Sequence, residues 1–287
     1  MRLWPPASFK ARQIGDSGPP VHIKRQPDSW ILSEISDQLS RQLGYTVGSS
    51  TVHSAPLNYF VNYHRFEEVP SLSAAFFTHR ESWYKRYERM WWEVIEAVDL
   101  AVFQSEKYQL EAHQKFPKLT SVRIPPGYDP QVFRPKAMRI GVVGRSYGNG
   151  RKGEDLLEKV VQRFPNVEWI VSGGNWNVKS RKVAARKLPD LFRSLDYLLI
   201  PSRTEGGPMS AIEALACGVP VISANVGWMP ELPHIEFESG DLESLCSVIS
   251  GLLESRERLQ NSVEGRTWAS FAEKHKAAFT SLIEGAK

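Results

Sequence analysis

The stretch from Pro201 to Gly227, PSRTEGGPMSAIEALACGVPVISANVG, limits the possible folds of this chain more than any other. The apolar run 197–200 leads into it and indicates a buried strand that ends at a proline. The Gly-Gly pair at 206–207 allows a sharp turn, and Pro208 suits the first position of a helix. The small apolar residues that follow predict this helix, and residues 219–223 predict the next strand. This strand–turn–helix–strand order is typical of an α/β protein with a parallel sheet.

The same stretch predicts a binding site. A helix N-terminus presents free backbone N–H groups and the positive end of its dipole, which together favour an anion such as a phosphate. Glu205 lies in the turn and Glu213 within the helix, and a carboxylate accepts hydrogen bonds from hydroxyl groups. The site therefore suits a phosphorylated ligand rich in hydroxyls. For two isolated glutamates, a helix cap and a solvated helical side chain would be the simpler interpretation.

The whole context resembles the signature of retaining GT-B glycosyltransferases, in particular glycosyltransferase family 4 (group 1). In that signature two glutamates separated by seven residues precede a small-residue helix and a G-V-P-V strand. Glu205, Glu213 and the segment 218–221 match it. The resemblance implies an α/β fold of the GT-B type, with two Rossmann-like domains that face a central cleft. It also implies a C-terminal helix that returns to the N-terminal domain.

The resemblance extends over about residues 74–285 and suggests three parts. The segment VRIPPGYDPQVFRP is similar to the family's interdomain linker, and its clustered prolines indicate a boundary near Pro135. We therefore predict an acceptor-binding domain over 1–136, a nucleotide-sugar-binding domain over 137–265 and a returning helix over 266–287. Prolines and glycines interrupt residues 1–27, for which we predict mostly loop, and the sequence assigns this segment no particular role.

A second motif follows the strand predicted at 138–143. The sequence GRSYGNGRKGEDLL places four glycines around Arg145, Arg151 and Lys152, just before a helix, and such a turn can wrap a diphosphate. Arg145 and Lys152 match the two cations that hold the donor diphosphate in the family. Taken alone, the loop could also belong to a dinucleotide-binding oxidoreductase. The G-x-G-x-x-G spacing and a clear acidic ribose ligand are missing, which argues against that alternative.

The resemblance implies the following residue roles. His79 follows the strand predicted at 74–78, where the family has a histidine that contacts the transferred sugar. The catalytic residues are expected to be His79, Arg145, Lys152 and Glu205. His79 and Arg80 are expected to contact the acceptor, and no metal is expected because no Asp-x-Asp motif is present. The donor is expected to bind Arg145, Lys152, Gly174, Glu205, Gly206, Gly207, Pro208, Met209, Ser210 and Glu213.

Charge and aromatic residues leave the acceptor open. The net charge is +4, and residues 137–203 hold 13 Lys and Arg against 6 Asp and Glu, which suits an anionic donor or simply a solvated surface. The helix predicted over 81–98 interleaves aromatic and basic residues, which can contact nucleic acid. Its residues 84, 87, 91 and 95 also form an ordinary core stripe.

These observations predict a metal-independent, retaining glycosyltransferase that needs no cofactor beyond a nucleotide-sugar donor, UDP-sugar first and GDP-sugar second. The predicted acceptor is a saccharide or another hydroxylated metabolite. Alternatives are a DNA glycosyltransferase acting on hydroxymethylated bases, the oxidoreductase, and a nucleic-acid-binding module without activity. No run has the length of a membrane span and no early segment resembles a signal peptide, so a cytoplasmic location is expected.

Overall fold

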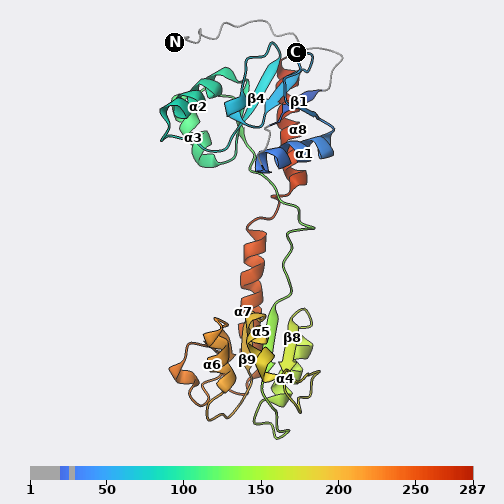
Figure 1. The fold of residues 1–287 in the computed structure, drawn as a ribbon, viewed down its shortest axis with the longest axis vertical. Coiled ribbons are helices and arrows are strands. Elements are labelled where there is room, and N and C mark those ends of the chain that lie inside the picture. The colour runs from blue at the N-terminus through green and yellow to red at the C-terminus, as the bar shows by residue number, and fades with distance from the viewer. Residues whose placement is uncertain (1–19, 26–29, 287) are drawn as a thin grey trace. The chain divides into compact units, whose positions relative to one another are not determined.

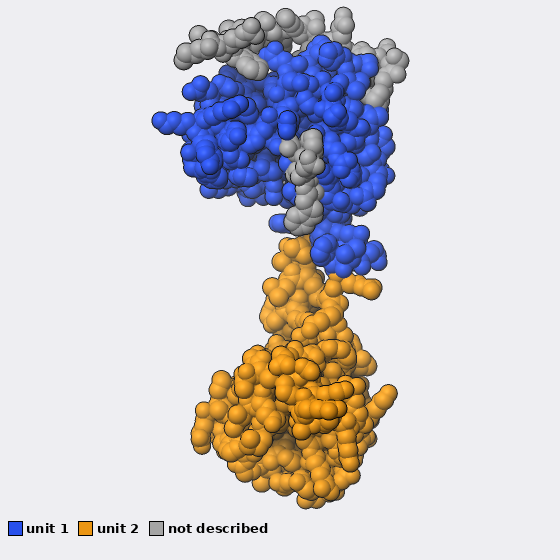
Figure 2. Space-filling model, viewed as in Figure 1, with its two compact units in different colours: residues 1–133, 264–287 blue, residues 134–263 orange. Residues whose placement is uncertain are grey.

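The structure is a computed structural model that describes residues 20–25 and 30–286. The chain folds into two compact units. One unit combines residues 1–133 with 264–287, and the other contains residues 134–263 (Figure 2). The chain therefore passes between the units twice, and the first unit is built from both ends of the sequence.

The first unit contains a six-stranded sheet in which every pair of neighbours is parallel. The strand order is β2-β1-β3-β4-β5-β6, so the central strands are buried on both faces, as parallel strands usually are. The strands are β1 (Val21–Lys24), β2 (Thr46–Gly48), β3 (Leu57–Phe60), β4 (Leu72–Phe77), β5 (Leu100–Phe103) and β6 (Ser121–Arg123).

Helices cover both faces of this sheet and divide its core in two. Alternate residues of β4 point to opposite faces, so that Phe76 belongs to one apolar cluster and Phe77 to the other. The cluster around Phe76 includes residues of α1 (Trp30–Leu43) and α8 (Trp268–Gly285) (Figure 1). The cluster around Phe77 includes residues of α2 (Lys85–Ala97) and α3 (Glu106–Lys115).

The last helix is an integral part of the first unit. Trp268, Phe271 and Phe279 of α8 are buried in the cluster that contains Tyr59 of β3. His275 of the same helix is buried, and its Nδ1 donates to the carbonyl of Phe271 at 3.0 Å. Its Nε2 therefore accepts a hydrogen bond from the Tyr59 hydroxyl at 3.0 Å. The returning helix predicted for a GT-B fold is confirmed.

The buried histidine predicts an acid-sensitive first unit. Burial lowers the pKa of His275 from an ordinary 6.5 to about 4, so the unfolded chain binds a proton more readily than the folded chain between these values. The stability contributed by the neutral ring is complete above pH 6.5 and is lost as the pH falls towards 4. We expect the free energy of unfolding to fall by about 3 kcal/mol between pH 7 and pH 4 from this group alone.

Urea unfolding at pH 7 and pH 4 measures this loss. His275→Gln, whose side chain does not titrate, is expected to be less stable at pH 7 and to lack this share of the pH dependence. An equal pH dependence in both proteins would show that other groups cause it.

The second unit contains a five-stranded parallel sheet in the order β11-β10-β9-β7-β8. Its strands are β7 (Arg139–Val143), β8 (Glu168–Ser172), β9 (Tyr197–Ile200), β10 (Val221–Ser223) and β11 (Ile235–Glu236). Its helices are α4 (Glu154–Arg163), α5 (Leu188–Arg193), α6 (Met209–Ala216) and α7 (Leu242–Asn261). The predicted class of two Rossmann-like α/β domains is thus confirmed.

The N-terminal region, predicted as mostly loop, contains one strand that the sequence did not predict. Residues 21–24 form β1, which has a neighbouring strand on each side. Its buried His22 is retained because its ring nitrogens bond to Thr46 Oγ1 at 2.8 Å and the Ser50 carbonyl at 2.9 Å. Most of the remaining segment 1–27 lies outside the described residues. Among the described helices, none has both the length and the apolar character that a membrane crossing requires.

Candidate active site

The candidate site lies at one edge of the second sheet. Strands β7 and β9 are parallel neighbours, so the loops that follow them, 144–153 and 201–208, leave the sheet at the same edge. The first loop leads into α4 and the second into α6. The glycine-rich loop and the turn containing Glu205, which are far apart in the sequence, therefore meet in space.

Two glycines allow the loops to pack this closely. Gly153 has φ +71°, and a Cβ there would lie 2.0 Å from the Pro201 carbonyl oxygen. Gly173 follows β8, and a Cβ there would lie 1.8 Å from the Gly144 carbonyl oxygen. A side chain at either position would separate the loops, because neither partner atom belongs to a flexible side chain.

The buried carboxylate of Glu154 fixes the conformation of the glycine-rich loop. Its Oε1 accepts hydrogen bonds from Ser146 Oγ at 2.7 Å, from Gly148 N at 3.0 Å and from Tyr147 N at 3.3 Å. Burial raises the pKa of this carboxyl, but the hydrogen bonds outweigh burial and hold the pKa below its ordinary value. The loop is therefore organised around an ionised glutamate before any ligand binds.

Arg203 ties the two loops together. Its guanidinium binds both carboxylate oxygens of Asp155, at 2.6 and 3.0 Å, and the Gly150 carbonyl at 3.0 Å. Its backbone N–H donates to the carbonyl of Arg151 at 2.9 Å. A bidentate pair of this kind fixes orientation as well as distance. Lys152, the next residue after Arg151, is thereby placed beside the turn that contains Glu205.

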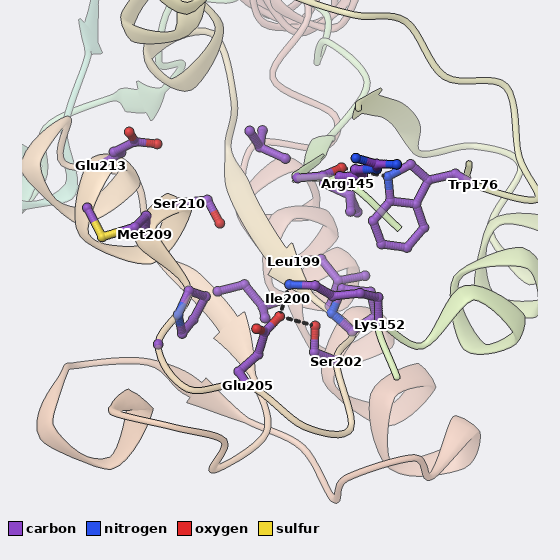
Figure 3. Close-up of a pocket in the computed structure, with 16 residues that line it drawn as sticks. Arg145, Lys152, Trp176, Leu199, Ile200, Ser202, Glu205, Met209, Ser210 and Glu213 are labelled. Atoms are coloured by element: carbon purple, nitrogen blue, oxygen red, sulfur yellow. Dashed lines mark hydrogen bonds and ion pairs between the residues drawn. The ribbon is translucent and has the colours of Figure 1, made fainter. Parts of the chain in front are cut away.

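The two loops enclose a pocket of about 260 Å³ (Figure 3). Lys152 Nζ forms an ion pair with Glu205 Oε1, which also accepts a hydrogen bond from Ser202 Oγ at 2.7 Å. The side chains of Glu205 and Lys152 are only 8% and 19% exposed. A partly buried carboxylate and ammonium therefore share one corner of the pocket, each within reach of a ligand.

Arg145 and Trp176 form another part of the pocket wall. The Arg145 side chain is exposed and has no carboxylate within 4 Å among the residues that the structure describes. Its guanidinium lies over the ring of Tyr147, 5.6 Å from the centroid. Trp176 Nε1 donates to the Gly144 carbonyl at 2.8 Å, which fixes the indole beside the loop. Arg145 therefore remains available to an anion.

The N-terminus of α6 closes the third side. Pro208 precedes the helix and forms no side-chain cap, so Met209 and Ser210 present uncapped first-turn positions to the pocket. Behind them, a Cβ on Gly207 would lie 2.4 Å from the Trp228 ring. Glu213, one turn further along α6, also lines the pocket and is exposed (Figure 3).

The structure brings together most of the residues predicted to bind the donor. The pocket is lined by Arg145, Lys152, Glu205, Gly207, Pro208, Met209, Ser210 and Glu213. Gly206 and Gly174 belong to the adjoining loops and do not line the pocket. Pro208 precedes the helix instead of occupying its first position.

The two residues predicted to contact the acceptor lie in the other unit. His79 follows β4 and is about half exposed, with its Nε2 3.9 Å from Glu81 Oε1. Arg80 pairs with Glu88 at 2.8 Å and with Glu111 at 3.5 Å, so its charge is already balanced within the unit.

Sequence reasoning missed Ser202 and Trp228. Ser202 directly follows the proline that ends β9 and orients Glu205. Its position three residues before Glu205 was the available signal. Trp228 contacts Gly207 only because two loops meet, which no local pattern shows. Among the described residues, no group of His, Cys, Asp or Glu side chains is arranged to hold a metal ion.

Comparison with known proteins shows similarity to glycosyltransferases. Residues 137–255 match the family model described as "Glycosyl transferases group 1". A D-inositol 3-phosphate glycosyltransferase of Mycobacterium marinum is 25% identical over 63% of this chain and 47% of its own length. One component of the phosphatidylinositol N-acetylglucosaminyltransferase of Homo sapiens is 32% identical over 55% of this chain and 40% of its own length.

A GDP-mannose-dependent alpha-(1-6)-phosphatidylinositol monomannoside mannosyltransferase of Mycolicibacterium smegmatis is 24% identical over 53% of this chain and 52% of its own length. The chain thus spans about half the length of the curated relatives it matches. Among solved structures, a sucrose-phosphate synthase of Thermosynechococcus elongatus aligns with 96% of this chain and 88% of its own, at 17% identity and a TM-score of 0.37.

Proposed function

Since residues 137–255 match the family model of group 1 glycosyl transferases, we propose that this chain transfers a sugar from a nucleotide-sugar donor to a hydroxyl group of an acceptor. The reaction is proposed to retain the anomeric configuration and to require no metal. The acceptor is a saccharide or another hydroxylated metabolite, and the donor is a UDP-sugar or, as the name of the GDP-mannose-dependent relative suggests, a GDP-sugar.

The convergence of opposite charges in one pocket carries this proposal. Positive potential comes from Lys152, from the exposed Arg145 and from the uncapped start of α6. Beside them, the Glu205 carboxylate can accept hydrogen bonds from hydroxyl groups. A nucleotide sugar needs both, because its diphosphate is anionic and its sugar carries hydroxyl groups. A ligand with only one of these features would leave part of the pocket unused.

In the proposed reaction these groups act on the bond between the sugar and the diphosphate of the donor, which breaks. As the sugar separates from the diphosphate, negative charge grows on the leaving oxygen, and Lys152, Arg145 and the α6 N-terminus stabilise it. Glu205, held by Ser202, accepts hydrogen bonds from the sugar hydroxyls, and Glu213 does so from the ribose. The acceptor attacks from the same face, and the donor phosphate helps to remove its proton, so Glu205 is not the nucleophile.

The first unit is proposed to bind the acceptor. His79 contacts the transferred sugar, and Arg80 supports the acceptor side from the loop that follows β4.

Donor binding tests the proposal directly. UDP-, GDP-, ADP- and dTDP-sugars are added separately to the full chain, and thermal unfolding and nucleotide release are measured. We expect the sugar of one nucleotide to raise the unfolding temperature of the protein. We also expect that nucleotide to be released slowly as its sugar is hydrolysed. Stabilisation by NAD(H) or by DNA, with no response to any donor, would contradict the proposal.

A further inference from the structure

A group of polar and aromatic side chains outside the donor pocket lies at one edge of the first sheet. Strands β3 and β4 are parallel neighbours, paired from Leu57 with Leu72 to Phe60 with Ala75. The segments that follow them therefore leave the sheet at the same edge, where open α/β sheets bind ligands. The first contains a 3₁₀ turn, Tyr63–Arg65, and the second is the loop 78–84 before α2.

Five rings, four from these segments and one from Tyr87 in the first turn of α2, form a continuous aromatic rim. Successive ring centroids are 4.8 Å apart from His64 to Tyr87, 5.8 Å from Tyr87 to Tyr84 and 6.3 Å from Tyr84 to Trp83. Trp83 then stacks on His79 at 6.4 Å and 18°. Trp83 is 67% and Tyr84 57% exposed, so the outer part of the aromatic rim presents ring faces to solvent. Large exposed aromatic residues next to one another form an apolar patch of the kind that marks a binding surface.

Two hydrogen-bonding groups at the same sheet edge lack partners among the described residues. The Tyr63 hydroxyl and His64 Nε2 are buried and have no hydrogen-bond partner among the described residues. An unsatisfied buried polar atom is costly, and in native proteins such an atom usually marks a site for water or a ligand. Asn62 Oδ1 accepts a hydrogen bond from the His64 backbone N–H at 2.9 Å and so fixes the turn. This bond does not satisfy the Tyr63 hydroxyl or His64 Nε2.

The Glu81 carboxylate lies beside His79, at one end of the aromatic rim. Its Oε1 is 3.9 Å from His79 Nε2. The pKa of Tyr63 is raised first by burial and then by the charge of Glu81. Burial lowers the pKa of His64, and the charge of Glu81 opposes that shift, so the His64 ring is neutral at pH 7. The Glu81 carboxylate beside His79 therefore lies at the same sheet edge as the Tyr63 phenol and the neutral His64 imidazole, whose ring centroids are 4.1 Å apart.

This combination fits a hydroxyl-rich ring. Each hydroxyl both donates and accepts, so it can donate to Glu81 and bond with Tyr63 and His64. The C–H faces of a pyranose or cyclitol ring are apolar and flat enough to lie on Trp83. A bare phosphate would be repelled by Glu81. A bilayer or DNA duplex would be attracted by the exposed Lys85 and Arg86 of α2 but would leave the buried hydroxyl and imidazole unsatisfied.

We propose that Tyr63, His64, Glu81 and Trp83 form a binding site for a polyhydroxylated ring, with Trp83 under its flat face and the other three bonded to its hydroxyls. The inference rests on the proposed function in one respect, since it identifies this ring as the sugar or cyclitol acceptor. The site belongs to the first unit alone and so can be tested without any donor.

Ligand-observed NMR on the full chain provides the test, with methyl α-D-glucopyranoside, methyl α-D-mannopyranoside and myo-inositol as probes. Saturation transfer is expected to at least one of the three. Trp83→Ala and Glu81→Gln are expected to weaken that binding about fivefold or more. Leu110→Ala, which removes an exposed apolar side chain from α3 of the same unit, should leave binding unchanged.

Tyr63→Phe separates a binding role from a structural one. Because the Tyr63 hydroxyl has no partner among the described residues, its removal should leave the unfolding temperature unchanged or higher while weakening polyol binding about fivefold. Loss of stability in Tyr63→Phe would overturn the proposal. So would equal binding by all the variants, no binding of any probe, or Trp83-dependent binding of a DNA duplex or of phosphatidylserine vesicles in place of the probes. If no nucleotide sugar binds while polyol binding that depends on Trp83 persists, the proposed transferase function is wrong and the proposed polyol site is still supported.

Discussion

Lys152→Ala is expected to lower the rate of nucleotide-sugar cleavage by about 100- to 1000-fold, the usual loss when one group that stabilises a leaving anion is removed. Lys152 Nζ is the cation paired with Glu205 in the pocket. The backbone hydrogen bond from Arg203 N to the carbonyl of Arg151 holds the adjacent Lys152 beside Glu205. The variant also leaves the nearly buried Glu205 carboxylate with Ser202 as its hydrogen-bond partner. Steady-state nucleotide release with the donor that binds is the measurement.

The matched control is Lys159→Ala, which removes an exposed lysine from α4 seven positions later. It should leave the rate unchanged. Glu205→Ala should lose activity to a similar extent as Lys152→Ala, and the double variant should lose much less than the sum of the two, because the paired groups act on the same donor. Normal nucleotide release by a folded Lys152→Ala would remove this residue from the mechanism.

Trp91→Ala is expected to destabilise the first unit by about 3–5 kcal/mol, the usual cost of deleting a large buried ring. Trp91 is 1% exposed. Its ring contacts those of Tyr63 and Phe77, each at 5.0 Å between centroids, and that of Tyr108 at 5.5 Å. The residual cavity would lie between the sheet and α2, where the backbone cannot collapse far. Urea unfolding monitored by circular dichroism measures the loss.

Trp83→Ala is the control, since it is the same substitution in the same unit at a ring exposed to solvent. Its free energy of unfolding should stay within about 0.5 kcal/mol of the wild type. A similar loss in both variants would mean that Trp83 has a structural role, which would also weaken its assignment to ligand binding.

Most of the residues predicted to bind the donor line one pocket in the structure, because the patterns that singled them out are local. Lys152 and Glu205 are 53 positions apart, yet each lies in a loop whose glycines and flanking strand indicated its place at the same sheet edge. The core stripe predicted on α2 was correct for Trp91 and Ile95, which are buried, but Tyr84 is exposed. Tyr84 precedes the first turn of the helix, where the helical period does not yet apply.

Other features depended on contacts that no local pattern reveals. Strand β1 spans four residues, too few for periodicity, and the two prolines before it favoured loop. Tyr63 and His64 were not singled out, because their unsatisfied atoms become visible only when the turn after β3 meets the loop after β4. Trp228 reaches Gly207 for a similar reason.

The placement of α8 in the core of the first unit sets the order in which the chain can mature during translation. The second unit is continuous in sequence and has all its strands once residue 236 has been synthesised. The first unit, although its sheet is translated earlier, exposes the apolar surface around Tyr59 and Phe76 until residues 268–285 leave the ribosome. The unit whose sheet is translated first is thus completed last. If synthesis stops before α8, the nascent chain keeps an exposed apolar surface that is prone to aggregation and is recognised by chaperones and proteases.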